Sequence, residues 1–337
     1  MRLGIIGFGY WAKILARCFS QHPEFELRCI ADIAPERCWE ARNSFQTATV
    51  TSVPDELLAT DAIDAVAIAT PADTHAALVR TALQAEKHVW VEKPLARTGQ
   101  EAAELALFAQ HCRRTLFIDH TFLYCNSIKR IKQMLECSEL ERIRSYASIR
   151  TNKGKPRTDA SIYHDLAIHD LAILDFLMGE SPLAVSVTPP SADPDTPCED
   201  ELITLTYASG TTGSIRVNWS APAKVRRILI SSDRQTVVFD DMNSHHKLRL
   251  LNVVSPQRAD DSANQLDIDP ELVGRVVPLH DTRETLANAI ECFLDCIHCG
   301  RQPVSDGWQG VRLATILDAC LSSADAGGVW EHVASHS

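Results

Sequence analysis

The chain has 337 residues, of which 45% are hydrophobic and 23% charged, and its formal net charge at pH 7 is −11. This length predicts about two domains of roughly 100–200 residues, each able to bury a core of its own. The acidic balance argues against nonspecific nucleic-acid binding, because phosphate backbones need a basic face.

Neither a membrane span nor a metal site is expected from the sequence. The segment Met1–Ile6 has the pattern of a strand and not of a secretory signal, and no uncharged apolar run reaches the about 18 residues of a spanning helix. Eleven cysteines are scattered through predicted helices and strands, which favours free thiols in a reducing cytoplasm. The group Cys292, Cys296, His298 and Cys299 lacks the second half of a zinc site, so packing within a core helix is the preferred interpretation.

Apolar strands and amphipathic helices alternate through the first 120 residues. The run Ala62–Ala69 is almost continuously apolar, as expected of a strand buried on both faces of a parallel sheet. Together these segments predict a Rossmann domain with a doubly wound parallel sheet over residues 1–120. The expected strands are Leu3–Gly7, Glu26–Asp32, Ala62–Ala69, His88–Glu92 and Thr115–Asp119, and the expected helices are Trp11–Ser20, Ala72–Ala85 and Thr98–Cys112.

After His120 the pattern changes to strands in which apolar and polar residues alternate. Ile203, Leu205 and Tyr207 fall on one face of such a strand, which predicts an antiparallel sheet with one covered face. Residues 121–337 are therefore expected to form a second α/β domain, for substrate binding and oligomerisation, and packing of its C-terminal helices back on the first domain is left open. Its further elements are helices at Asn126–Glu136, Asp165–Leu177, Arg283–Cys299 and Gly307–Ala324, and strands around Ile215–Trp219, Arg227–Ser231 and Thr236–Asp240.

A glycine-rich turn, Gly7-Phe8-Gly9-Tyr10-Trp11-Ala12, follows the first strand and opens the first helix. This is the context that a dinucleotide fingerprint requires. The first glycine permits the tight turn, the second lets the backbone approach a pyrophosphate, and the alanine keeps the helix close to the sheet. The helix N-terminus adds free N–H groups for phosphate.

Asp32 stands at the end of the second strand, twenty residues beyond Ala12. A carboxylate there accepts hydrogen bonds from ribose hydroxyls and repels a 2′-phosphate, which favours NAD over NADP. Arg37, five residues further on, is within reach of a phosphate and keeps NADP as the less favoured alternative.

Two loops are expected beside the cofactor, because ligands of doubly wound sheets bind at the carboxyl ends of the strands. They are Thr70-Pro71-Ala72-Asp73-Thr74-His75 and Glu92-Lys93-Pro94. His75 either lines the cofactor or is a surface residue at the helix terminus. Lys93 can donate to a substrate oxygen, and Lys93–Pro94 is a candidate for a cis peptide bond.

Asp165 and His169 are four residues apart in a helical segment, which places them on one helical face. An imidazole titrates near working pH, so this pair is a candidate for proton transfer together with Lys93. The neighbours His164 and Asp170 point elsewhere on the helical wheel and are interpreted as non-catalytic.

These motifs together resemble the Gfo/Idh/MocA family of oxidoreductases (glucose–fructose oxidoreductase, inositol dehydrogenase and rhizopine catabolism proteins) over essentially the whole chain. The resemblance rests on the glycine-rich turn, Glu92-Lys93-Pro94, the Asp165-x-x-x-His169 signature and the segment 300–307. It implies a Rossmann domain followed by an α/β domain with a large, mostly antiparallel open sheet. It also implies that Lys93, Asp165 and His169 are catalytic, and that the chain forms homodimers or homotetramers through the open sheet face.

A finer similarity links Asp119–Tyr124 and Asn218–Trp219 to bacterial branches of the family that act on nucleotide-linked sugars. His120 and Tyr124, with Arg150 and Asn152 at a strand edge, are therefore candidate substrate contacts. The basic stretch 153–157 either meets a diphosphate or carboxylate of the substrate or is an exposed turn.

The sequence thus predicts hydride transfer between a nicotinamide and a secondary alcohol carbon of a sugar or nucleotide sugar. His169 is expected to exchange the hydroxyl proton, Lys93 to hold the oxygen, and Asp165 to orient its partners. The alternatives are a dehydrogenase of inositol or another free polyol, an NAD-sensing regulator without catalysis, and an enzyme that hydrolyses glycosides with bound NAD and no net redox change.

Overall fold

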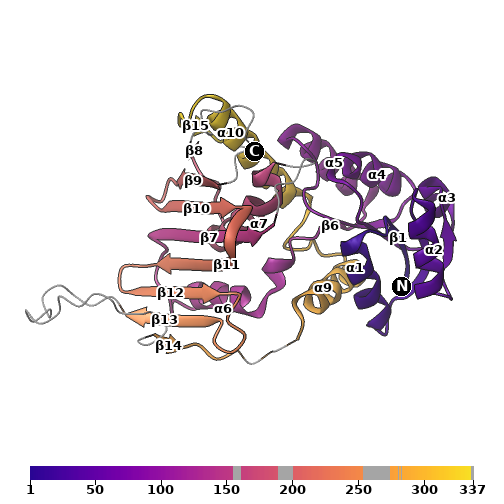
Figure 1. Cartoon of the computed structure of the whole chain (residues 1–337), viewed down its shortest axis with the longest axis horizontal. Helices are drawn as coiled ribbons and strands as arrows, with labels where there is room; N and C mark the ends of the chain where they lie inside the picture. Colours follow the sequence, from indigo (N-terminus) through magenta and orange to yellow (C-terminus); the bar gives the residue numbers. More distant parts are fainter. Residues whose placement is uncertain (155–160, 189–199, 253–273, 280, 282, 335–337) are drawn as a thin grey trace, which may run out of the picture. The chain divides into compact units, whose positions relative to one another are not determined.

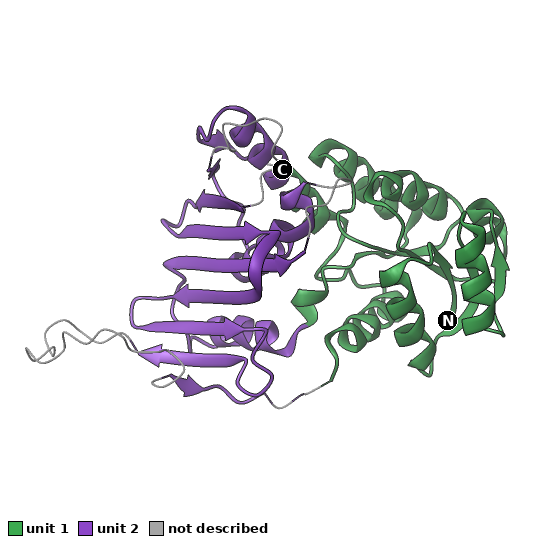
Figure 2. Ribbon diagram, viewed as in Figure 1, with its two compact units in different colours: residues 1–124, 283–315, 336 green, residues 125–282, 316–335, 337 purple. Residues whose placement is uncertain are grey.

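The computed structural model describes residues 1–154, 161–188, 200–252, 274–279, 281 and 283–334. Within it the chain forms two compact units (Figure 2). Unit 1 comprises residues 1–124 and 283–315, and unit 2 comprises residues 125–282 and 316–335. The long helix α10 (Gly307–Asp325) begins in unit 1 and ends in unit 2.

Unit 1 is built on a six-stranded sheet in the order β3-β2-β1-β4-β5-β6, with every pair parallel (Figure 1). This confirms the predicted doubly wound sheet. Its strands are β1 (Arg2–Ile6), β2 (Glu26–Ala31), β3 (Thr49–Thr51), β4 (Ala65–Ile68), β5 (His88–Val91) and β6 (Leu116–Ile118). Its helices are α1 (Tyr10–Gln21), α2 (Pro35–Ser44), α3 (Pro54–Ala59), α4 (Ala72–Gln84), α5 (Gly99–Cys112), a 3-10 turn at Thr121–Tyr124, and α9 (Thr285–Cys299).

Segments from near the end of the sequence complete the core of unit 1. The ring of Phe293 in α9 packs edge-on against Trp90 and Phe117, with ring centroids 5.6 and 5.5 Å apart. At the start of α10, a Cβ on Gly310 would lie 2.5 Å from Ile118 Cδ1, so the helix backbone lies directly against β6. Glycine at this position therefore permits a close approach that a larger residue would prevent.

Unit 2 is built on a nine-stranded sheet in the order β14-β13-β12-β11-β7-β10-β9-β8-β15. Only the central pair of β7 and β10 is parallel among its described pairings, which confirms a mixed, mostly antiparallel sheet. The strands are β7 (Ser145–Lys153), β8 (Ala184–Val187), β9 (Asp200–Thr206), β10 (Thr212–Asn218), β11 (Ser220–Ser231), β12 (Gln235–Asp240), β13 (Leu248–Asn252), β14 (Arg275–Val276) and β15 (Glu331–His332).

Two helices, α6 (Asn126–Glu136) and α7 (Ile168–Met178), cover one face of this sheet (Figure 1). The predicted alternation is confirmed, because Ile203, Leu205, Ile215 and Val217 are all fully buried on this covered face. A Cβ on Gly213 of β10 would contact Leu174 Cδ2 of α7 at 3.1 Å, so the helix packs closely on the central strands.

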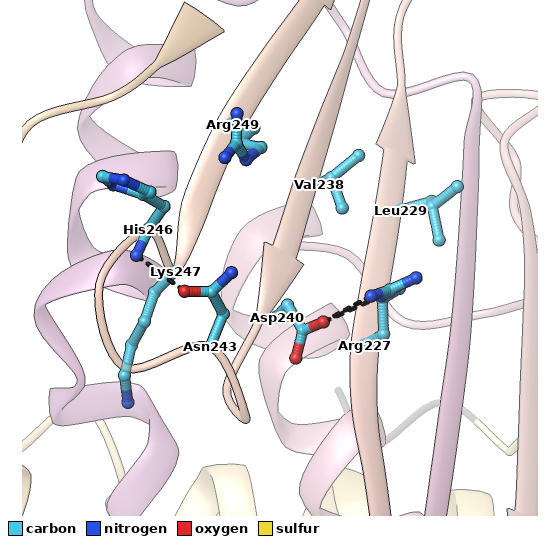
Figure 3. A pocket seen from close by; sticks show the side chains of 8 residues that line it. All are labelled: Arg227, Leu229, Val238, Asp240, Asn243, His246, Lys247 and Arg249. Carbon is cyan, nitrogen blue, oxygen red and sulfur yellow. Dashed lines mark hydrogen bonds and ion pairs between the residues drawn. The ribbon is translucent and has the colours of Figure 1, made fainter. Parts of the chain in front are cut away.

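The opposite face, called the outer face below, carries apolar side chains that are exposed in the single chain. Ile149 of β7 and Leu202 of β9 are each 42% exposed. A pocket of about 90 Å³ opens on this face beside the β12–β13 loop (Figure 3). Leu229 and Val238 contribute apolar side chains to the pocket. The other lining residues are Arg227, Asp240, Asn243, His246, Lys247 and Arg249.

Candidate active site

The glycine-rich turn of unit 1 has the conformation that a dinucleotide needs. Gly7 has a φ of +90°, and a Cβ there would lie 2.5 Å from the carbonyl oxygen of Ala69, so this position requires glycine. A Cβ on Gly9 would have no atom within 4 Å, which leaves open space over the turn. Gly9 precedes α1 without a side-chain cap, so the helix N-terminus keeps backbone N–H groups for a phosphate.

The side chains of Phe8, Tyr10 and Trp11 in this turn differ in burial and in contacts. Phe8 is a core residue whose ring packs edge-on against Phe45, with the centroids 6.1 Å apart. Tyr10 is 82% exposed at the start of α1. The indole N–H of Trp11 donates to Asp119 Oδ2 at 3.1 Å, which ties the turn to the end of β6.

Asp32 is buried at the end of β2 and holds the glycine-rich turn by accepting backbone hydrogen bonds. Oδ2 accepts from Phe8 N at 2.6 Å, and Oδ1 accepts from Ala34 N at 2.9 Å. Arg37 Nη1 lies 3.6 Å from Oδ2, and its side chain is half-exposed. These residues therefore fit the adenosine end of a nicotinamide dinucleotide, with a carboxylate and a guanidinium at the position that distinguishes NAD from NADP.

His75 joins the two loops that follow β4 and β5. Its Nδ1 lies 2.7 Å from the carbonyl oxygen of Pro94, and its Nε2 lies 2.9 Å from that of Thr70. The ring is buried, so the interpretation of His75 as a surface residue is wrong. Burial, reinforced by the charge of Lys93, lowers the pKa of His75. The peptide bond Lys93–Pro94 is cis, which confirms that prediction.

Lys93 lies among buried titratable groups at the carboxyl ends of β5 and β6. Burial, together with the charge of Asp119 and a hydrogen bond to it, raises the pKa of Glu92 well above its ordinary value, and Lys93 opposes this effect. Burial and the Lys93 charge lower the pKa of His120 to about 3. Near neutral pH, Lys93 therefore has a neutral imidazole, His120, in its surroundings, beside a Glu92 carboxyl group whose pKa is raised.

Tyr124 is only 2% exposed, and its hydroxyl lies 2.8 Å from Ser305 Oγ. Its ring stacks on Phe117 with centroids 5.2 Å apart. The ring and hydroxyl of Tyr124 therefore belong to the core of unit 1, and the prediction that Tyr124 contacts substrate is wrong.

The spacing predicted one uninterrupted α-helix for the segment of unit 2 that carries Asp165 and His169. The structure differs from this prediction at the start of the segment. Residues Tyr163–Ala167 form a π-helical turn that leads directly into α7. A π-helical turn is wider than an α-helical one, and four residues remain close to one turn, so Asp165 and His169 stay a predicted pair. Asp165 accepts a hydrogen bond from the indole N–H of Trp219, with Nε1 and Oδ2 2.9 Å apart. Trp219, which links β10 to β11, thus positions the carboxylate from the sheet.

Arg150 forms a buried ion pair that the sequence did not predict. Its Nε donates to Asp170 Oδ2 at 2.5 Å, and the two side chains are 3% and 2% exposed. Nη2 lies 3.4 Å from Asp170 Oδ1. Arg150 was expected to contact substrate, but its Nε and Nη2 atoms are bound by α7. Asn152 lies two residues further along the same face of β7 and is half-buried.

The remaining expectations concern the basic stretch, metals and membranes. Lys153 and Gly154 are exposed at the end of β7, whereas Lys155, Pro156 and Arg157 lie outside the described residues. Cys292 and Cys296 lie on α9 with their sulfurs 4.0 Å apart. Across the described ranges we find no cluster of three side chains arranged to ligate a metal ion. In the same ranges, no helix combines the length and apolar character needed to span a membrane.

Trp219 and Asp119 are the site residues whose roles sequence reasoning missed. For Asp119 a signal was present, since it follows β6 as Glu92 follows β5, and neighbouring parallel strands end at the same edge of the sheet. For Trp219 the sequence showed a core position on a strand, but the partner of its indole N–H depends on the fold.

A Rossmann unit with this turn, joined to an open-sheet unit that carries an Asp/His helix, defines the class of two-domain nicotinamide-dependent oxidoreductases. The family model described as "Oxidoreductase family, NAD-binding Rossmann fold" matches residues 1–120, and that of the GFO/IDH/MocA C-terminal domain matches residues 128–238. The chain belongs to the Gfo/Idh/MocA family and is an NAD(P)-dependent oxidoreductase.

Several characterised proteins are similar to the chain over nearly its full length. UDP-N-acetylglucosamine 3-dehydrogenase of Acidithiobacillus ferrooxidans is 29% identical over 93% of this chain and 94% of that protein. A crystal form of it superposes with a TM-score of 0.81 at 26% identity, covering 97% and 98% of the two chains. Inositol 2-dehydrogenase of Rhizobium meliloti is 24% identical, covering 96% of each chain. The 2,7-anhydro-N-acetylneuraminate hydratase of Escherichia coli is also 24% identical, over 90% and 88%.

Proposed function

We propose that the enzyme transfers a hydride between a nicotinamide and a secondary alcohol carbon of a sugar or nucleotide sugar. One observation carries the proposal: both sets of groups that this chemistry requires are present. Unit 1 supplies Lys93, at the carboxyl end of β5 in the sheet that also carries the glycine-rich turn, and unit 2 supplies His169, with Asp165 held by Trp219. Similarity to dehydrogenases named for a nucleotide sugar and for inositol supports the substrate class.

We propose that His169 takes the hydroxyl proton during oxidation and returns it during reduction, since an imidazole exchanges protons near neutral pH. Lys93 binds the same oxygen and stabilises the negative charge that develops on it. Asp165, fixed by the indole of Trp219, orients His169. The bound nicotinamide supplies the hydride chemistry.

Two alternative functions would use the same catalytic residues, Lys93, Asp165 and His169. A dehydrogenase of inositol or another free polyol differs only in lacking a nucleotide on its substrate. A relative named as a hydratase supports a second candidate, in which product forms without net change in the nicotinamide. A regulator without catalysis is disfavoured, because a regulator has no need for both Lys93 and His169.

The test is turnover of a panel of nucleotide sugars, free sugars and inositols, followed by the absorbance of reduced nicotinamide. We expect wild-type turnover of one sugar class, and a loss of kcat of about a hundredfold or more in Lys93→Met and in His169→Gln. NAD affinity, measured by calorimetry, is expected to stay within a few-fold in both variants. Wild-type kcat in either variant would remove the assigned roles.

We further propose that copies associate through the outer face of the nine-stranded sheet, as a homodimer or homotetramer. The exposed side chains of Ile149 and Leu202 and the pocket with its apolar Leu229 and Val238 support this surface. A cytoplasmic location is also proposed, since the ten cysteines within the described ranges are free thiols.

A further inference from the structure

Two carboxyl groups, those of Glu92 and Asp119, meet at the carboxyl ends of neighbouring strands in unit 1. Glu92 follows β5 and Asp119 follows β6, and these strands are paired in parallel. Asp119 is 1% exposed, and its side chain is hydrogen-bonded to that of Glu92. An ionised carboxylate only accepts hydrogen bonds, so a bond between two carboxyl groups requires a proton on one of them. The two groups therefore share a proton.

The hydrogen-bond donors around this carboxyl pair are unequally divided. Asp119 Oδ2 accepts from the indole N–H of Trp11 at 3.1 Å, and Asp119 Oδ1 accepts from the hydroxyl of Thr121 at 2.7 Å. Glu92 accepts from the backbone N–H of Lys93, and among the described residues its buried Oε1 atom has no hydrogen-bond partner. Donors stabilise the charged form of a carboxyl group. The negative charge is therefore favoured on Asp119 and the proton on Glu92.

These contacts form one chain of hydrogen bonds from the glycine-rich turn to the backbone of Lys93. The chain begins at Trp11 in the first turn of α1, passes through Asp119 and Glu92, and ends at the Lys93 N–H. The backbone is fixed as well, because Asp119 N donates to the carbonyl oxygen of Val91 at 2.8 Å. The carboxyl pair thus connects the turn that fits a dinucleotide to the loop that carries the lysine.

The location of the shared proton decides which charge lies next to Lys93. When the proton is on Glu92, the carboxyl group beside the lysine is neutral and the negative charge lies on Asp119. A negative charge on Glu92 would instead attract the Lys93 ammonium group and compete with a substrate oxygen for it. Lys93 opposes the rise of the Glu92 pKa, so the two groups do interact. His120, the other titratable group that Lys93 affects here, is neutral near pH 7 because burial lowers its pKa to about 3.

We propose that Asp119 is a positioning residue that keeps a proton on Glu92, so that the ammonium group of Lys93 stays available to the substrate oxygen. Trp11 ties this arrangement to the glycine-rich turn by donating to Asp119. Asp119 acts through its neighbours and needs no contact with substrate. This inference rests on the proposed function, because it assumes the catalytic role of Lys93.

The first experiment measures how fast Lys93 of the free enzyme reacts with an acetyl N-hydroxysuccinimide ester at pH 8, by mass spectrometry of its peptides. Only the uncharged amine reacts, and a nearby carboxylate stabilises the ammonium form. Asp119→Asn removes the group that carries the charge, so the charge moves to Glu92 and Lys93 should react about tenfold more slowly. The double variant Asp119→Asn/Glu92→Gln has no carboxylate at either position, so its Lys93 should react at least as fast as that of wild type.

The second experiment measures turnover. Asp119→Asn should lower kcat about tenfold, with KM for substrate within a few-fold of wild type. Adding Glu92→Gln to Asp119→Asn should restore most of the lost kcat, which damage to the fold alone would not do. Trp11→Phe removes one of the two donors to Asp119, so it should slow both acylation and turnover to a smaller extent. Trp39→Phe is the matched control, because Trp39 is 67% exposed on α2, and it should keep wild-type values.

An unchanged acylation rate in Asp119→Asn would overturn the inference, as would a slow rate that Glu92→Gln does not reverse. Circular dichroism checks the fold, and Trp11→Phe supplies the deciding acylation rate if Asp119→Asn does not fold. Wild-type kcat in Lys93→Met would instead remove the proposed function. The acylation rates need no substrate, so they would still decide where the shared proton lies.

Discussion

Glu92 shows at the scale of one residue how burial changes the chemistry of a motif. In the sequence Glu92 is a charged neighbour of Lys93. In the fold its side chain is buried beside Asp119, and its pKa is raised well above the ordinary value of 4.5. Motif and spacing predicted where the loop lies, but not the raised pKa of Glu92, because the second carboxylate, Asp119, follows another strand.

Glu92→Gln is expected to remove a pH dependence of stability. The folded state binds the Glu92 proton more tightly than the unfolded state does, so wild-type stability is greatest below the ordinary pKa and is lost as pH rises towards the folded pKa. Every tenfold difference in proton affinity between the two states contributes about 1.4 kcal/mol to the free energy of unfolding. Urea unfolding from pH 4 to pH 8 should therefore show wild type losing stability relative to the variant. Parallel curves for the two proteins would contradict the assignment.

Asp32→Ser is expected to shift cofactor preference towards NADP. The substitution removes the carboxylate and leaves the Arg37 guanidinium, which was 3.6 Å from it, to meet a 2′-phosphate. The ratio of kcat/KM for NADP to that for NAD should rise by about tenfold or more. Some loss of thermal stability accompanies the change, since Asp32 also accepts from Phe8 N and Ala34 N. An unchanged ratio would show that Asp32 does not select the cofactor.

At the scale of elements, the sequence predicted the helices and strands that have a regular apolar pattern, but not the short or irregular ones. Strands β1, β2, β4, β5 and β6 of unit 1 and helix α6 were predicted within a few residues of their bounds, because apolar runs and amphipathic patterns dominate them. The short elements β3, α2 and α3 were missed, since too few residues carry their pattern. The π-helical turn at Tyr163–Ala167 was missed because its sequence also satisfies an α-helix, and contacts such as that between Trp219 and Asp165 depend on the fold.

Trp219→Phe is expected to test how the sheet positions this turn. Phenylalanine keeps an aromatic ring but has no indole N–H, so the Asp165 carboxyl group loses a hydrogen bond worth about 1–3 kcal/mol. We expect kcat to fall by about tenfold or more, with KM for NAD unchanged. Circular dichroism and the melting temperature check that the fold survives. Wild-type kcat in a folded variant would mean that the indole does not position Asp165 for catalysis.

At the scale of the whole molecule, composition and pattern predicted two α/β parts and their sheet types. The sequence left open that the C-terminal helices pack back on the first domain, and α9 with the first part of α10 does belong to unit 1, through contacts such as those of Phe293 and Gly310. The alternation of β9 and β10 predicted which side chains face the helices, but the exposed apolar residues of the outer face give no comparable sequence signal.

The outer face offers a test of association. Replacing Ile149 and Leu202 by lysine places charges among exposed apolar side chains, so the double variant should have the mass of a single chain by light scattering, while the wild type is dimeric or tetrameric. Leu107→Lys is the control, because Leu107 is an exposed leucine on α5 of unit 1. A wild-type protein with the mass of one chain, or a double variant that still associates, would exclude this surface.

The central claim is net hydride transfer to and from a sugar carbon. Its most direct measurement follows deuterium from the reacting carbon of a labelled substrate into the nicotinamide, by mass spectrometry of the reduced cofactor. We predict one deuterium per turnover at the nicotinamide ring and a slower rate with the labelled substrate. Product formation with no deuterium left in the released cofactor would contradict the account and favour chemistry without net redox.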